Sequence, residues 1–165
     1  MLELLQTLGP FFLEIAKTLG PFFIATIGWV LVNRQNNLRE DRKEARSIID
    51  KIIEYLSLIE SDAYAFHTAD ARDKSAERKV KLRIKTLACR LGHCSKMFSC
   101  AEFTQEIIRF RQACTKLNFE TEEFNQQVSN SEILLGINEQ ADKIRDKLER
   151  VFLDSFPRSH RKPKT

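Results

Sequence analysis

The sequence predicts an all-α fold in which one N-terminal transmembrane helix precedes an antiparallel bundle of about four helices. Apolar residues recur at intervals of three and four positions through most of the chain after residue 39, as in helices that bury one face. No segment shows the alternation of apolar and polar residues that marks a strand. The stretch 18–33 carries no charge, and 165 residues suffice for one domain plus an anchor.

The segment before Arg34 differs from the rest of the chain in charge. Only Glu3, Glu14 and Lys17 carry ionisable side chains there, whereas charges are dense from Arg34 onward. As a helix, residues 18–33 would extend roughly 24 Å, slightly less than the ~30 Å hydrocarbon core of a bilayer, and the flanking basic side chains can reach outward to the headgroups. We therefore divide the chain into an interfacial or outer extension (1–17), a transmembrane helix (18–33), a cytosolic bundle (34–157) and a basic disordered tail (158–165).

Two alternatives to a membrane span must be weighed. A cleaved signal peptide is disfavoured because no basic region precedes the apolar stretch and no small-residue cleavage site follows it. Basic residues follow instead, and the positive-inside rule then places the C-terminal part in the cytosol and Met1 outside. An amphipathic helix lying in the membrane plane stays open, because Pro10 and Pro21 can interrupt a longer helix.

A hexapeptide, TLGPFF, occurs twice in the predicted anchor, at 7–12 and again at 18–23. The interval between the two copies corresponds to about three helical turns, so the repeated positions share one face and suit contact with a second copy of the chain. Polar residues form a stripe on this segment. The simpler interpretation is that Glu14 and Lys17 are a local pair at the outer interface, and the alternative is a self-association face or a lined pore. The candidate residues are Pro10, Glu14, Lys17, Pro21, Gly28 and Trp29.

The bundle is predicted from four apolar patterns. A first long helix covers 39–67 and can continue from the membrane helix, a turn follows at 70–73, a second helix covers about 80–98, and a last helix runs from about 131 until Pro157. Ser99 and Glu102 form a capping box that would open a third helix. The expected core residues are Ala45, Ile48, Ile49, Ile52, Ile53, Leu56, Ile59, Ala63 and Phe66; Val80, Leu82, Ile84, Leu87, Leu91, Cys94 and Phe98; Phe103, Ile107, Phe110, Cys114 and Leu117; and Ile133, Leu134, Ile137, Ala141, Ile144, Leu148, Val151 and Phe152.

The second helix of the bundle has a basic face, because the segment 78–101 contains seven Lys or Arg and no acid before Glu102. Three interpretations stay open: ion pairs with acids of neighbouring helices, a surface for nucleic acid, or a patch against the inner leaflet. The residues expected to contact lipid or an acidic partner are Arg34, Arg39, Arg42, Lys43, Arg78, Lys79, Lys81, Arg83 and Lys85.

Nothing in the sequence predicts catalysis, a metal or a cofactor. Cys89, His93, Cys94 and Cys100 lie close together in the sequence, but their spacing fits no zinc signature and only Cys89 and His93 share a helical face. The three histidines are far apart, and no nucleophile elbow or phosphate loop is present. We therefore predict a protein that is not an enzyme and whose cysteines are free thiols.

The N-terminal part of the chain, roughly the segment 1–50, carries a resemblance. The segments 22–29, 33–37 and 39–44, which read FFIATIGW, NRQNN and REDRKE, resemble the start of small uncharacterised inner-membrane proteins of bacteria, prophages and plasmids. The resemblance implies a location in the bacterial inner membrane and a role in a mobile element or an anti-phage system.

The resulting hypothesis is a non-enzymatic single-pass membrane protein that self-associates and acts as an effector, immunity or exclusion protein, with membrane lipid and a cytosolic protein as further partners. A passive tether or adaptor for a cytosolic partner is the alternative. A membrane protein that binds nucleic acid through residues 78–96 ranks third, because no aromatic side chains that could stack on bases are interleaved there.

Overall fold

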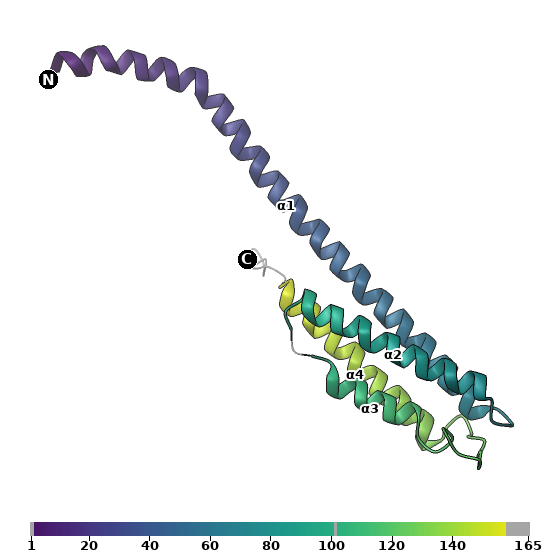
Figure 1. The fold of residues 1–165 in the computed structure, drawn as a ribbon. Coiled ribbons are helices and arrows are strands. Elements are labelled where there is room, and N and C mark those ends of the chain that lie inside the picture. Colours follow the sequence, from purple (N-terminus) through teal and green to yellow (C-terminus); the bar gives the residue numbers. More distant parts are fainter. Residues whose placement is uncertain (1, 101, 158–165) are drawn as a thin grey trace, which may run out of the picture. The chain divides into compact units, whose positions relative to one another are not determined.

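The structure, a computed structural model, describes the backbone of residues 2–100 and 102–157 and the side chains of residues 19–100 and 102–157. Within these ranges the regular elements are four helices: α1 (Leu2–Thr68), α2 (Lys74–Met97), α3 (Thr104–Cys114) and α4 (Glu132–Ser155) (Figure 1). The predicted all-α class is therefore confirmed. The side chains of Pro10, Glu14 and Lys17 and the predicted tail 158–165 lie outside the described residues.

The chain separates into two compact units, residues 1–44 and residues 45–165. The first unit is the N-terminal part of α1, whose backbone stays helical through both Pro10 and Pro21, and none of its described side chains is buried. Among the residues with described side chains, no helix contains a stretch long and apolar enough to cross a membrane.

The second unit is a bundle of four helices, formed by α1 from Ala45 onward together with α2, α3 and α4. Both longer partners, α2 and α4, run antiparallel to α1 (Figure 1). The Asp73 carboxylate caps α2 by accepting a hydrogen bond from the Ser75 amide (2.7 Å), and the Ser131 hydroxyl caps α4. Ion pairs connect the helices at their edges, as between Arg46 of α1 and Glu149 of α4 at 2.8 Å.

The core contains the apolar faces of all four helices, and most of the residues predicted from helical periodicity are buried in it. Ile48, Ile53, Phe98, Ile107 and Ile133 are partly buried at its margin. Two predictions were wrong: Leu82 is 64% exposed, and Leu117 is 54% exposed. Leu82 breaks the three-four spacing of α2, and Leu117 lies beyond the end of α3.

The predicted capping box was also wrong. Ser99 adopts φ 48°, in the left-handed region, and α3 begins only at Thr104, with Phe103 at the N-cap position and no side-chain cap. Glu102 accepts a hydrogen bond from the Thr104 hydroxyl (3.0 Å) instead of pairing with Ser99. The buried ring of Phe103 anchors the start of this helix in the core.

The connection between α3 and α4, residues 115–131, is irregular but is bound to the bundle. The Asn118 side chain donates to the Asn125 carbonyl (2.8 Å) and accepts from the Asn125 amide (3.1 Å). Arg72, which pairs with buried Glu77 at 2.7 Å, also donates to the Thr121 carbonyl at 2.6 Å. The centroid of the Phe119 ring lies 4.5 Å from that of Phe66. This loop therefore closes one end of the core.

His67, fully buried beneath this loop, is a polar residue in an apolar core. Its Nε2 lies 2.9 Å from the Cys114 carbonyl, which can only accept, so Nε2 carries the proton and Nδ1 faces the Asn118 amide nitrogen at 3.4 Å. Burial lowers the pKa of His67 below its ordinary value, although the hydrogen bond to Cys114 opposes this shift. The neutral imidazole therefore fits this site.

The core can be tested by truncating one buried leucine. Leu91→Ala removes a fully buried side chain and should cost about 2–5 kcal/mol in the free energy of unfolding, measured by urea titration followed by circular dichroism. The matched control is Leu82→Ala on the same helix, which should change stability by about 0.5 kcal/mol or less. Equal losses in the two variants would contradict the described packing.

The buried histidine predicts a dependence of stability on pH. Because the pKa of His67 is lower in the folded than in the unfolded chain, its contribution is complete above the ordinary value of 6.5 and is lost as the pH falls below it. Urea titrations at about pH 7.5 and about pH 5.5 should show this loss in the wild type and a smaller one in His67→Gln. His93→Gln, at an exposed histidine, should behave like the wild type. An unchanged pH dependence in His67→Gln would count against this account.

Candidate functional site

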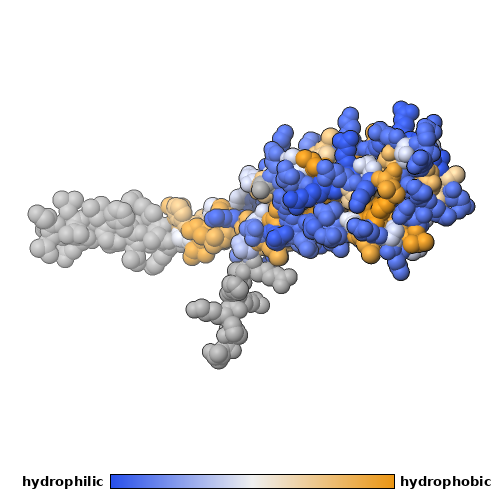
Figure 2. Space-filling view, turned by 90° about the horizontal axis from the view of Figure 1, so that it is seen from below, coloured by the Kyte–Doolittle hydropathy of each residue, from blue (hydrophilic) through white to orange (hydrophobic). Residues whose placement is uncertain are grey.

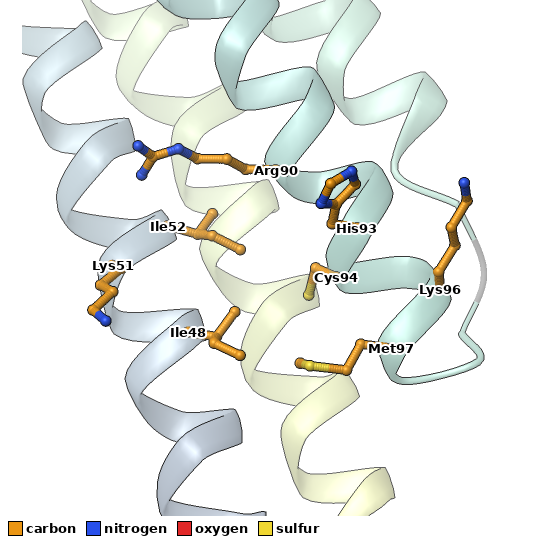
Figure 3. A pocket seen from close by; sticks show the side chains of 8 residues that line it. All are labelled: Ile48, Lys51, Ile52, Arg90, His93, Cys94, Lys96 and Met97. Carbon is orange, nitrogen blue, oxygen red and sulfur yellow. The ribbon is translucent and has the colours of Figure 1, made fainter.

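A groove of about 730 Å³ lies between α1 and α2 within the bundle (Figure 3). It is open to solvent and occupies the end of the bundle where α1 enters it. The lining residues come from two turns of α2 and one turn of α1. They are Ile48, Lys51, Ile52, Arg90, His93, Cys94, Lys96 and Met97.

The floor of the groove is apolar. Ile48 and Ile52 of α1 face Cys94 and Met97 of α2 across the space between the two helices (Figure 3). Ile52 and Cys94 also belong to the core, whereas Met97 is 48% exposed. The groove therefore continues the hydrophobic core outward to the surface.

The rim of the groove is basic. Arg90 extends from α2 toward α1 (Figure 3), and its guanidinium carbon lies 4.2 Å from the ring centroid of Tyr55, a cation–π contact that orients the group. Lys51 and His93 are exposed on the two walls, and Lys96 points away from the floor. None of the eight lining residues is acidic. The nearby carboxylate of Asp50 pairs with Arg46 at 2.9 Å.

Other basic residues of α2 are paired within the bundle. Lys79 and Arg83 both contact Asp62 of α1, at 3.0 and 2.9 Å, and Lys81 contacts Glu77 at 2.7 Å. The hydrogen bonds of Lys81 to Glu120 and Glu77 raise the pKa of its ammonium group. These three of the residues predicted to contact lipid or an acidic partner thus lie in intramolecular ion pairs.

The remaining residues of that prediction are exposed. Arg78 and Lys85 of α2 make no ion pair with a described residue, and Arg34, Arg39, Arg42 and Lys43 lie on the first unit of the chain. The same unit holds Pro21, Gly28 and Trp29, which were predicted as self-association residues. Contacts of these residues with lipid or with a second copy stay predictions.

The four cysteines are free thiols. Cys94 and Cys114 are buried, and burial raises the pKa of Cys94 to about 11 and that of Cys114 to about 12, so both stay protonated at neutral pH. Cys89 is exposed on α2. Within residues 19–100 and 102–157, no group of three or more possible ligands converges to hold a metal ion.

The groove was missed as a site by sequence reasoning. Arg90 and Lys96 were counted in the basic face of the second helix, and Ile48, Ile52 and Cys94 were assigned to the core, but nothing joined them to Lys51. The one signal in the sequence that could have indicated the groove is that basic residues, Arg90 and Lys96, alternate with apolar residues, Leu91 and Cys94, near the C-terminal end of the second helix.

No family model, no curated protein and no solved structure matches the chain. The resemblance of its N-terminal part to small inner-membrane proteins therefore stays a prediction.

Proposed function

We propose that the chain is a non-enzymatic, single-pass protein of the bacterial inner membrane, whose anchor is residues 18–33 and whose bundle binds a partner in the cytosol. One observation carries the proposal. The apolar side chains of residues 19–32 are exposed, whereas the core of the bundle begins only at Ala45 and is complete without them. Figure 2 draws the described part of this stretch in orange, as apolar surface.

The distribution of these side chains favours lipid over a protein groove as their surroundings. Phe22, Phe23 and Ile24 are 70%, 65% and 75% exposed and, as consecutive residues of a helix, point in three directions. An amphipathic helix for a protein groove would have one apolar stripe and a polar back, whereas a helix apolar all round suits hydrocarbon. The basic residues Arg34 and Arg39 then favour a cytosolic bundle.

We further propose that the anchor self-associates. Self-association would make the protein an effector, immunity or exclusion protein of a mobile element or an anti-phage system. The repeated hexapeptide supports it. Gly28 adds a second reason, because a helix position without a side chain lets a neighbouring helix approach closely. If the anchor does not self-associate, the protein is a passive tether for a cytosolic partner.

Membrane insertion is tested by washing membranes with alkaline carbonate after expression of the full chain. We expect the wild type to stay in the pellet and Phe23→Lys/Ile27→Lys to be released, because two charges in hydrocarbon oppose insertion. Leu82→Lys, at an exposed leucine of the bundle, is the matched control and should stay in the pellet. Wild-type protein in the supernatant would refute the membrane proposal.

Replacing the anchor separates an effector from a tether. Residues 18–33 are exchanged for an unrelated transmembrane helix of equal length, and oligomers are measured by crosslinking in membranes. A self-associating effector should lose its crosslinked oligomers, and Gly28→Ile in the native anchor should weaken them because it blocks close helix approach. If oligomers persist after the exchange, the bundle is the part that self-associates. If the wild type is already a monomer, the result favours the tether.

A further inference from the structure

We propose that the groove between α1 and α2 binds a single-chain anionic amphiphile of the fatty acid type. The carboxylate would bind the Arg90 guanidinium, with Lys51 as a second positive charge on the α1 wall, and the alkyl chain would lie on the floor formed by Ile48, Ile52 and Met97. This site is a property of the bundle and does not depend on the proposed membrane anchor.

The size of the groove indicates a small ligand. A volume of about 730 Å³ lies within the roughly 300–1,000 Å³ of small-molecule sites. The step from Arg90 to Met97 along α2 gives a length of about 10 Å, only two helical turns, which is short for docking a partner helix by several anchors. A flexible alkyl chain can follow the open floor and shield Ile48 and Met97 from water.

The charge of the groove selects the sign of the ligand. Arg90 and Lys51 form no hydrogen bond or ion pair with a described residue, so their N–H donors are available to a ligand. Stacking on Tyr55 orients the Arg90 guanidinium, and a guanidinium of fixed plane can donate two parallel hydrogen bonds to one carboxylate. With no carboxylate among the lining residues, a cationic amphiphile finds no opposite charge at the rim, and a neutral one forms weaker hydrogen bonds there than a carboxylate does.

The combination of floor and rim excludes simpler anions as the best occupants. Inorganic phosphate would use the basic rim but would leave the floor exposed to water. Nucleic acid would need aromatic side chains for its bases, and the aromatic ring next to the rim, that of Tyr55, is covered by Arg90. A ligand with one anionic end and one alkyl chain satisfies both parts of the groove.

The test uses the full chain in phosphatidylcholine nanodiscs, labelled with a photoreactive lauric acid whose adducts are located by mass spectrometry. We expect adducts on the peptides containing Ile48 to Ile52 and Cys94 to Met97. Laurate should compete with this labelling, whereas dodecyltrimethylammonium and inorganic phosphate should not. Competition by the cation or by phosphate alone, or adducts confined to other peptides, would overturn the proposal. If carbonate extraction shows that the chain is not inserted in membranes, the same labelling is done in buffer, so the two proposals fail separately.

Matched variants connect the labelling to the basic rim. Lys51→Gln/Arg90→Gln should reduce adducts on the groove peptides roughly tenfold, because the charge-assisted hydrogen bonds of Arg90 and the positive charge of Lys51 are lost. Lys85→Gln removes an exposed charge from the same helix outside the groove and should leave labelling unchanged. Arg90→Lys, which keeps the charge, should retain more labelling than Arg90→Gln. Equal labelling of the double variant and the Lys85→Gln control, with unchanged circular dichroism spectra, would also refute the site.

Discussion

The bundle depends on the burial of one apolar stripe of α1, from Ala45 to Phe66. Ile49, Leu56 and Ile59 on this stripe are fully buried, and α2 and α4 pack along it with apolar faces of the same three-four spacing. Ion pairs lie along its edges, where Asp62 contacts Lys79 and Arg83 of α2 and Arg46 contacts Glu149 of α4. Hydrophobic burial therefore holds the bundle together, and the ion pairs add contacts at its edges.

The same helix behaves differently before Ala45. There the apolar residues surround the helix axis instead of forming a stripe, and none of the described side chains from residue 19 to residue 44 is buried. One continuous helix thus combines a part with a buried apolar stripe and a part, from residue 19 to residue 44, in which no described side chain is buried. A hydrocarbon environment would complete the second part, as proposed above. Lys51 at the basic rim of the groove follows the end of the proposed anchor on the same helix.

The helices of the bundle could be predicted from the sequence because each carries a regular apolar pattern and clear boundaries, such as Asp73 before α2 and Ser131 before α4. The prediction that Leu82 is buried was wrong because Leu82 is apolar but does not fit the three-four spacing of α2. The predicted start of α3 was wrong because Ser99 adopts a left-handed conformation that no capping pattern indicates. The groove could not be predicted. Lys51 and Arg90 are far apart in the sequence, and only the three-dimensional register of α1 and α2 brings both to one rim.

The loop at residues 115–131 has a consequence for how the chain can vary. Loops of this length usually tolerate insertions because they lie free over the surface. In this loop Asn118 bonds the backbone of Asn125, Arg72 donates to the Thr121 carbonyl, and the Gln127 amide donates to the His67 carbonyl. Phe119 lies in the core, so an added residue would displace several of these contacts together. In evolution the length of this loop should therefore be constrained as strictly as that of a helix, although no regular secondary structure marks it.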